Sequence, residues 1–377
     1  MTCDIVGIGA VASIGDDPRA IFEALCEGRT GRAELRAFDR SRFRARFAYE
    51  IDDRPEPGAD EPYRATRWLR QAISQAASDA GLAEIPSHYP LLIGTTLHEQ
   101  RTAELWWRKE IPLNPRALRF GASGDADLGL ASSYTFANAC AASLCALALA
   151  ADMIDLGLTD TVIVGGADCI TESVYGVLDR VQNSIPDAVR PFDTDRRGML
   201  PGEGAVAVVL RREGLHQGAV HGRLRAVAMN CDAGHPTAPD KQSIAAAVRE
   251  AHQRAGLSAA DIDLVMLHGT GTPLNDVSEA AVLGEIFSTP GPLMTAIKSG
   301  TGHTLGASGL MSLVTALLAM SDGVVPPIAG LTSPVPEAAG LRLVSGGAEQ
   351  ASLRTAQVNA FGFGGINAVA AVQKADR

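Results

Sequence analysis

Short apolar runs that often end in glycine alternate along this chain with alanine-rich amphipathic stretches. This alternation constrains the fold more than any other feature. The runs are rich in Val, Ile and Leu and predict buried strands at 5–9, 91–94, 161–165, 205–210, 264–267 and 368–372. The stretches between them have helical period and predict helices at 65–80, 141–156, 244–255, 278–287 and 307–320. Alternating strands and helices favour an α/β architecture with largely buried sheets.

The chain has 377 residues, which suits one large domain or two fused halves. A polar, glycine-containing passage at 211–222 (RREGLHQGAVHG) separates two parts that each contain the alternation. The sequence therefore predicts a pseudo-duplicated fold with halves at 1–215 and 216–377. The segments 52–61 and 99–119 are predicted to be excursions from the core, because proline, arginine and tryptophan interrupt their pattern.

The formal net charge of -10 would repel a phosphate backbone, and no basic stripe is interleaved with aromatic residues. Nucleic acid is therefore not an expected partner. An acidic surface can still carry a local basic patch for an acidic partner protein. The candidates are Arg64, Arg67, Arg70, Arg116 and Arg119. Scattered arginines are more often part of a solvated face, so this alternative stays open.

The six cysteines show neither CxxC spacing nor histidines at metal-ligand spacing, so reduced thiols are expected. The N-terminus lacks a basic region and runs directly into a predicted strand. No apolar run is expected to approach the eighteen residues that a membrane span needs. The sequence therefore predicts a cytoplasmic protein that does not use a membrane as a partner.

Cys140 lies where a predicted strand passes into a predicted helix, in the segment 134–147 (YTFANACAASLCAL). Free N–H groups and the positive end of the helix dipole favour the thiolate there, so we expect a lowered thiol pKa and a reachable nucleophile. A cysteine among alanines is also typical of an inert core residue. Cys3, Cys26, Cys145 and Cys169 fit that second interpretation.

Two histidines lie in loops rich in glycine and threonine. His268 begins the segment HGTGTPLND directly after a strand, and His303 ends the segment KSGTGH just before a helix. Glycines at both places let backbone approach a ligand, which packing alone does not explain. Most of the remaining histidines have no such context and are interpreted as structural.

Two further segments are rich in glycine. In 359–367 (NAFGFGGIN), glycines flank Phe363 and would let its ring swing, although a tight turn between two strands would also explain them. In 190–204 (RPFDTDRRGMLPGEG), charged residues approach a predicted strand. We interpret this second segment as a buried ion-pair lattice around the site.

Together these motifs resemble the β-ketoacyl-acyl carrier protein synthases, the elongating condensing enzymes of fatty-acid and polyketide synthesis. The resemblance runs from 6–10 (VGIGA) to 364–367 (GGIN), with the motifs in the family's order. It implies a thiolase-like α/β fold, with two pseudo-duplicated halves in α-β-α-β-α layers. It also implies a nucleophile at Cys140, partner histidines at His268 and His303, and supporting residues at Lys298 and Glu279.

The resemblance further implies how the two half-reactions would be served. Backbone N–H groups of Cys140 and Phe363 would stabilise the oxyanion, and Phe363 would gate the second step. Thr270 and Thr272 would bind the phosphopantetheine arm of an acyl carrier protein, with His235 and Thr237 near the same pocket. Neutral imidazoles would suffice as donors, so no metal or organic cofactor is expected.

Degradative thiolases, which share the fold, use a second cysteine near the C-terminus, and no cysteine follows Cys231 here. Initiating synthases have an asparagine where this chain has His303. Both differences point to the elongating branch of the family. The segment between Thr95 and Leu130 is shorter than the family's pattern, and Ala141 and Ala142 are small. Acyl chain length and the choice between fatty-acid and polyketide or polyene synthesis therefore stay open. The oligomeric state also stays open between a homodimer and a heterodimer with a related subunit. Alternative roles are a chain-length, priming or decarboxylating subunit and a non-catalytic carrier-binding scaffold.

Overall fold

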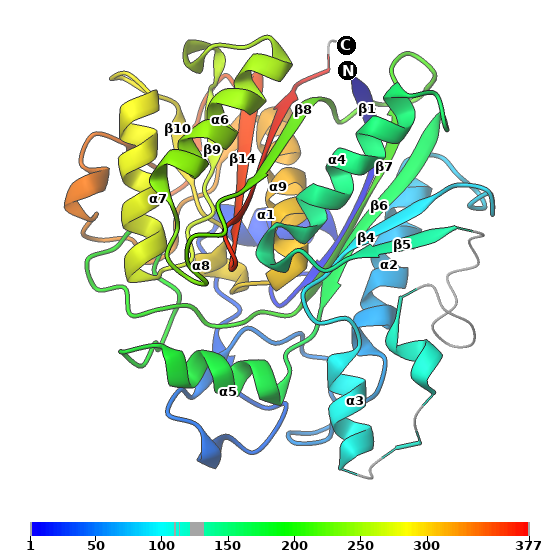
Figure 1. Cartoon of the computed structure of the whole chain (residues 1–377), viewed down its shortest axis with the longest axis vertical. Helices are drawn as coiled ribbons and strands as arrows, with labels where there is room; N and C mark the ends of the chain where they lie inside the picture. The colour runs from blue at the N-terminus through cyan, green and yellow to red at the C-terminus, as the bar shows by residue number, and fades with distance from the viewer. Residues whose placement is uncertain (1, 109–110, 113, 121–131, 376–377) are drawn as a thin grey trace.

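Eleven strands pair into one mixed sheet in the computed structural model, which describes residues 2–108, 111–112, 114–120 and 132–375 (Figure 1). The strands of this sheet are β1 Cys3–Ala12, β4 Leu91–Gly94, β5 Ser133–Phe136, β6 Thr161–Asp168, β7 Gly204–Arg212, β8 Gly222–Cys231, β9 Leu264–Met266, β10 Leu293–Thr295, β12 Arg342–Leu343, β14 Thr355–Gly362 and β15 Ile366–Gln373. Two small two-stranded ladders join β2 Ala33–Glu34 to β3 Phe47–Ala48 and β11 Val324–Val325 to β13 Glu349–Gln350.

Helices cover both faces of this sheet (Figure 1). In the described residues they are α1 Pro18–Cys26, α2 Arg64–Asp79, α3 Gln100–Trp107, α4 Ala142–Asp155, α5 Glu172–Val181, α6 Lys241–Ala255, α7 Pro273–Ile286, α8 Lys298–Thr301 and α9 Ser308–Asp322. Of these, α3 and α5 lie beyond one end of the sheet (Figure 1). Short 3₁₀ turns are η1 Arg40–Arg42, η2 Pro115–Leu118, η4 Ala139–Ala141, η5 Ala259–Asp261, η6 Leu305–Ala307 and η7 Pro336–Ala338.

Strand pairing repeats between the two halves of the sheet. The order is β12-β10-β9-β14-β15-β8-β1-β7-β6-β4-β5. In the first half, β4 is parallel to β5 and β6, and β7 is antiparallel to β6 and β1. In the second half, β9 is parallel to β10 and β14, and β15 is antiparallel to β14 and β8. The same pattern thus occurs twice, as expected of a pseudo-duplicated fold.

The two halves meet at β1 and β8, which pair only between residues 3–5 and 222–224. Helices α4 and α9 pack against each other between the halves, α4 on β4 and β6 and α9 on β14 (Figure 1). Helix α2 covers the other face of β1 and β7, and α6 covers the other face of β8 and β15. The predicted α-β-α-β-α layering is confirmed.

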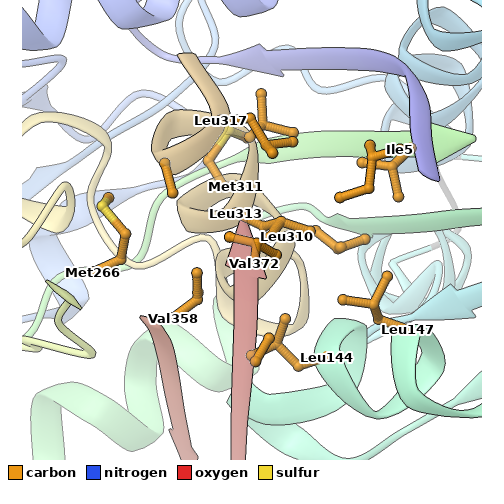
Figure 2. Packing of buried hydrophobic residues seen from close by; sticks show 14 of the residues in the cluster. Ile5, Leu144, Leu147, Met266, Leu310, Met311, Leu313, Leu317, Val358 and Val372 are labelled. Carbon is orange, nitrogen blue, oxygen red and sulfur yellow. The ribbon is translucent and has the colours of Figure 1, made fainter. Parts of the chain in front are cut away.

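The largest hydrophobic cluster fills the space around α4 and α9. Figure 2 shows Leu144 and Leu147 of α4 close to Leu310 and Leu313 of α9, with Val372 of β15 beside them. These side chains are almost fully buried. Burying each aliphatic side chain stabilises the fold by about 1.5–3 kcal/mol, so this layer holds the two helices that lead from Cys140 and His303 in a fixed relation.

Local signals explain where several helices begin and end. Asp17 accepts a hydrogen bond from the backbone N–H of Ala20 and caps α1, and Asp240 accepts one from Ser243 and caps α6. Helix α6 ends at Gly256 in the left-handed conformation, with φ of 68°, where only glycine is free of strain. Among the predicted helices, α6 has such signals at both ends, whereas α2, α4, α7 and α9 begin without a side-chain cap.

Two expectations need correction and one gains detail. The segment 99–119, predicted as an excursion from the core, contains helix α3, which lies away from the sheet (Figure 1), and residues 109–110 and 113 lie outside the described residues. Strands β8, β10 and β14 were not predicted. The stretch Leu305–Asp322 is long and apolar enough for a membrane span, with mean hydropathy 1.4, contrary to the expectation. Of that stretch, 89% is buried inside the structure, in the layer between the half-sheets.

The predicted boundary near residue 215 falls in the connection between β7 and β8, residues 213–221. The division into halves at 1–215 and 216–377 stays a prediction, because the sheet runs continuously through both.

Candidate active site

Cys140 lies at the elbow between β5 and α4, inside the turn η4. The residue before it, Ala139, has φ of 48°, a strained conformation for a residue with a Cβ, and it turns the chain so that Cys140 faces the pocket. The hydroxyl of Ser308 donates to the carbonyl of Cys140 at 3.4 Å, and the N–H of Leu310 donates to the hydroxyl of Ser143 at 3.1 Å. The first turns of α4 and α9 are therefore fastened together beside the thiol.

Glycines permit two close approaches around this elbow. A Cβ on Gly94 would lie 2.2 Å from the backbone nitrogen of Ser143, so no other residue fits there without a shift. A Cβ on Gly362 would lie 3.3 Å from Cβ of Ala139 and 3.4 Å from the nitrogen of Cys140. The turn between β14 and β15 can therefore press against the nucleophile elbow.

His303 lies next to the thiol, with Nε2 3.1 Å from Sγ of Cys140. Its Nδ1 accepts a hydrogen bond from the backbone N–H of Leu305 at 3.2 Å. A ring nitrogen that accepts has no proton, so this contact assigns the proton of the neutral ring to Nε2. Burial, with the charge of Lys298, holds the pKa of His303 well below its usual value. The ring is therefore neutral at pH 7 and presents an N–H donor to the pocket.

His268 lies on the other side of the pocket, with its ring centroid 5.6 Å from that of His303. Burial, followed by the charges of Lys298 and His303, holds the pKa of His268 well below its usual value. Nζ of Lys298 donates to the carbonyl of His268 at 2.5 Å and lies 3.4 Å from its Nδ1. An ammonium group can only donate, so it favours a neutral His268 with the proton on Nε2.

Lys298 and Glu279 lie behind the histidines, outside the pocket wall. Burial lowers the pKa of Lys298 to about 8, although the charges of Cys140 and Glu279 oppose the shift. The Glu279 carboxylate accepts from the backbone N–H groups of His268 at 2.7 Å and Gly269 at 2.9 Å. Asn359 donates to the same carboxylate at 3.0 Å. Glu279 therefore fixes the backbone that carries His268.

The thiol does not have the lowered pKa that the sequence predicted. Burial raises the pKa of Cys140 to about 11, and the charge of Lys298 and the backbone N–H groups of Phe363 and Cys140 only partly offset it. Desolvation outweighs the helix terminus here because the sulfur is enclosed by protein. The unloaded site therefore holds a thiol at pH 7. The same two N–H groups point toward the sulfur, as required of donors to an oxyanion.

A pocket opens in front of the sulfur. Most of the predicted site residues line it, and they come from distant parts of the chain: Cys140, His235, Thr237, His268, Thr270, Thr272, His303 and Phe363. The hydroxyls of Thr270 and Thr272 lie 2.9 Å apart. The free volume is about 30 Å³, which is little more than a few water molecules need. An acyl chain therefore needs part of this wall to move.

Phe363 lies at the tip of the turn between β14 and β15, with 42% of its surface exposed. Gly364 and Gly365 follow it with φ of 86° and 79°, so the turn depends on glycine. Both interpretations from the sequence therefore describe this segment in part: it is a tight strand connection, and it carries an exposed aromatic ring at the pocket. Movement of that ring stays a prediction.

The ligand atoms of Cys140, His268 and His303 lie within 4.8 Å of one another, close enough to raise the possibility of a metal ion. A metal ligand must offer an unprotonated nitrogen, yet the contacts of both Nδ1 atoms leave the proton on Nε2, which faces the pocket. The donor set therefore suits a developing negative charge better than a cation.

Several residues at the site were not predicted. Met199, Asn275 and Asn367 line the pocket, and the Asp276 carboxylate accepts from the backbone N–H groups of Phe192 at 2.8 Å and Thr270 at 3.1 Å. Asp276 lies three residues after the HGTGTP motif, which was a usable signal. Met199, Asn275 and Asn367 also lie inside segments singled out from the sequence, but nothing in those segments indicated that these side chains line the pocket.

Of the segment 190–204, predicted to form an ion-pair lattice, Glu203 lies in a buried ion-pair network, and this network involves two of the arginines suggested for a partner protein. Arg64 is buried and pairs with Glu203 at 2.9 Å and with Asp53 and Asp60, while Arg67 pairs with Asp53 and Glu61. Those two arginines are therefore not free to form a basic patch. Arg116 and Arg119 are exposed.

Comparison with known proteins adds the following. The family model "Beta-ketoacyl synthase, N-terminal domain" matches residues 3–216, and "Beta-ketoacyl synthase, C-terminal domain" matches residues 221–332. The chain is 31% identical to 3-oxoacyl-[acyl-carrier-protein] synthase 2 of Synechocystis sp., covering 98% of this chain and 97% of that protein. It is 28% identical to Nodulation protein E of Rhizobium sp., covering 98% of both. Among solved structures, "The ishigamide ketosynthase/chain length factor" is 29% identical, with a TM-score of 0.90 over 100% of this chain and 99% of that one.

Proposed function

Because the chain belongs to the β-ketoacyl synthase family, we propose that it joins an acyl group held on Cys140 to a malonyl unit on an acyl carrier protein. The reaction is a decarboxylative Claisen condensation that gives a β-ketoacyl-acyl carrier protein. The observation that carries the proposal is the pair of imidazole Nε2–H donors on His268 and His303, beside a cysteine at a strand-to-helix elbow.

In the first half-reaction, the sulfur of Cys140 attacks the carrier-bound thioester. A bond forms from sulfur to the acyl carbon, the bond from that carbon to the carrier sulfur breaks, and the thiol proton leaves with the carrier thiol. The backbone N–H groups of Cys140 and Phe363 stabilise the oxyanion between these steps. Because the resting group is a thiol, its deprotonation accompanies substrate arrival.

In the second half-reaction, the malonyl thioester loses carbon dioxide as its carbon–carboxylate bond breaks. The electron pair moves onto the thioester, and the oxygen of the resulting enolate accepts from Nε2–H of His268 and of His303. The enolate carbon then attacks the acyl carbonyl on Cys140, a carbon–carbon bond forms, and the thiolate leaves and regains a proton. These steps need no cofactor, because the protein supplies the donors and the leaving carboxylate supplies the electrons.

The outer pocket suits the carrier's flexible arm. Thr270 and Thr272 supply hydroxyls, and His235 and Thr237 lie at its exposed rim. Amide groups of a phosphopantetheine arm would hydrogen-bond there. Reduced thiols and soluble carrier substrates are consistent with the cytoplasm, which we propose as the location.

We further propose that the protein forms a dimer with a second subunit. β5 ends the sheet of the described residues with an unpaired edge, and Tyr134 on it is 52% exposed. Apolar side chains on and after α4 are also exposed: Leu149, Leu156 and Leu158. A two-fold partner that pairs with this edge would cover them.

A role as one subunit of a ketosynthase heterodimer is the second candidate. It is supported by the 29% identity to the solved structure "The ishigamide ketosynthase/chain length factor". A priming or decarboxylating subunit and a carrier-binding scaffold are further alternatives. The acyl chain and the pathway, whether fatty-acid or specialised polyketide synthesis, stay open. Part of the segment between Thr95 and Leu130, residues 121–130, lies outside the described residues.

The test supplies acyl and malonyl carrier proteins to the purified protein and follows products by mass spectrometry. An elongated β-ketoacyl carrier is expected, with an acyl adduct on Cys140 that Cys140→Ala lacks. Carbon dioxide release without elongation would favour the decarboxylating role. A stable acyl adduct on the Cys140→Ala protein would overturn the assignment of the nucleophile.

A further inference from the structure

Asp168 is a fully buried carboxylate that none of the steps above uses. It ends β6 and accepts from the hydroxyl of Thr95 at 2.8 Å and from the backbone N–H groups of Thr96 at 3.0 Å and Leu97 at 2.8 Å. Oδ2, the oxygen that accepts from Thr96, also accepts from the N–H of Gly306 at 2.7 Å. One side chain thus joins β6, the loop after β4 and the turn η6.

The turn η6 follows His303 and is under local strain. Leu305 has φ of 48°, which is unfavourable for a residue with a branched side chain. The backbone N–H of this residue is the donor to Nδ1 of His303. A Cβ on Gly306 would lie 2.6 Å from Cα of Thr95, so the turn is pressed against the loop that Asp168 also holds.

We propose that Asp168 is a positioning residue that holds the turn η6, so that the N–H of Leu305 keeps His303 in the tautomer with its proton on Nε2. The inference rests on the proposed condensation, which needs Nε2–H of His303 as a donor. Without the anchor at Gly306, the strained turn can relax and the N–H of Leu305 can leave Nδ1. His303 could then take the other tautomer, which offers no donor to the enolate.

The charge of Asp168 has no favourable effect on the nucleophile. Its carboxylate acts to raise the pKa of the Cys140 thiol, which disfavours the thiolate. A contribution of Asp168 to the reaction therefore passes through His303 rather than Cys140. Burial raises the pKa of Asp168 to about 7, although the hydrogen bonds from Thr95, Thr96, Leu97 and Gly306 favour the ionised form. In that form the side chain offers four lone-pair sites to its donors, whereas an asparagine must turn its NH₂ group toward at least one of them.

The experiment compares Asp168→Asn with Glu99→Gln as the matched control. Glu99 is also a buried carboxylate near the loop after β4, but its hydrogen bonds within the described residues are with Thr66 and Thr102 rather than with η6. Acylation of Cys140 and malonyl decarboxylation are measured separately, for both variants and in the His303→Ala background. We expect Asp168→Asn to lower decarboxylation about 100-fold and acylation only a few-fold. We expect the Asp168→Asn effect on decarboxylation to disappear when His303 is already alanine.

Additive losses in the double variant, or equal losses in both half-reactions, would overturn the inference. The inference would also be overturned if Asp168→Asn decarboxylated the malonyl carrier at the wild-type rate while His303→Ala did not decarboxylate it. If the wild-type protein itself neither decarboxylates nor condenses, the proposed function fails instead. Should Asp168→Asn not fold, ¹⁵N NMR of histidine-labelled wild-type protein still decides. The His303 signals, identified by their loss in His303→Ala, must show an unprotonated Nδ1, and a protonated Nδ1 would refute the proposal.

Discussion

At the scale of single residues, the state of the Cys140 thiol determines how the first half-reaction starts. Burial raises its pKa to about 11, so roughly one thiol in 10⁴ is ionised at pH 7. We expect alkylation of Cys140 by iodoacetamide, measured by mass spectrometry, to rise about tenfold per pH unit from 7 to 9. A plateau below pH 9 would show that the thiolate already predominates there.

Lys298 is the charged group that most opposes this shift in the thiol pKa. Lys298→Met should raise the thiol pKa further and slow alkylation at every pH in that range. The exposed Cys231 gives an internal reference within each sample, because its alkylation should be the same in both proteins. Faster alkylation of Cys140 in Lys298→Met would contradict this account.

The two half-reactions should respond differently to the loss of His303. His303→Ala removes an enolate donor but leaves the oxyanion donors of the first step, the N–H groups of Cys140 and Phe363. Radiolabelled acyl transfer to Cys140 should fall less than tenfold, while condensation should fall by about 10²–10³-fold. His252→Ala is the control, since this buried histidine bonds Gln357 away from the pocket. Equal losses in both steps would contradict the division of roles.

Residue identities were predictable where a motif gives the chemistry directly. Cys140, His268 and His303 each lie in a recognisable glycine- or alanine-rich segment, and the structure brings them together. The thiol pKa was not predictable, because desolvation depends on atoms from several distant segments. Asp168 was missed for the same reason: its donors at 95–97 and 306 are far away in the sequence.

At the scale of elements, we predict that the turn between β14 and β15 controls access to the pocket. The free volume of about 30 Å³ cannot hold an acyl chain, and Phe363 is the exposed ring on a glycine-rich turn. Phe363→Ala should let malonyl carrier enter before acylation, so that decarboxylation without an acyl group increases severalfold. Carbon dioxide release from malonyl carrier alone measures this.

The control for that experiment is Leu274→Ala, which shortens an exposed apolar side chain on α7. It should leave the order of the steps unchanged. If both half-reactions of Phe363→Ala have wild-type rates, the ring does not gate the pocket.

Helices α2, α4, α6 and α9 lie within a few residues of their predicted ends. α2 and α6 bury one face and show a helical period, whereas α4 and α9 are buried on nearly all sides and were recognisable as long apolar stretches rich in alanine and leucine. β14 and β8 were missed because polar residues interrupt their apolar runs. In β14, Gln357 and Asn359 are buried and hydrogen-bonded to each other. In β8, Arg223 and Arg225 alternate with apolar residues. Helix α3 was missed because two tryptophans obscure its pattern.

At the scale of the whole molecule, a buried ion network fastens the segment 50–64 to the core. Glu203 is fully buried just before β7 and pairs with Arg54 at 2.8 Å and Arg64 at 2.9 Å. The N–H of Gly202, next to it, donates to the carbonyl of His303. The network thus links the outer segment to the backbone that carries the site. Arg64 was interpreted as a candidate surface residue because its acidic partner Glu203 lies 139 positions away in the sequence.

This network makes a prediction about stability and pH. Burial would raise the pKa of Glu203, but the charges of Arg54 and Arg64 dominate and lower it to about 2. A carboxyl whose folded pKa lies below its unfolded value stabilises the fold above the unfolded pKa of about 4.3, and that contribution is lost as pH falls toward 2. Glu203→Gln leaves two arginines with one partner fewer and should cost about 3–5 kcal/mol of unfolding free energy at pH 7.

Urea denaturation of the wild-type protein and Glu203→Gln at a series of pH values measures that difference. It should be constant from about pH 7 to pH 5 and should shrink below about pH 4, because protonation of Glu203 in the wild-type unfolded state then removes the advantage. Glu61→Gln, which breaks the exposed pair with Arg67, serves as the control and should cost less than about 1 kcal/mol at any pH. A difference that grows as pH falls has the wrong sign for a carboxyl with a lowered pKa. It would mean that burial outweighs the charges of Arg54 and Arg64 and raises the pKa of Glu203.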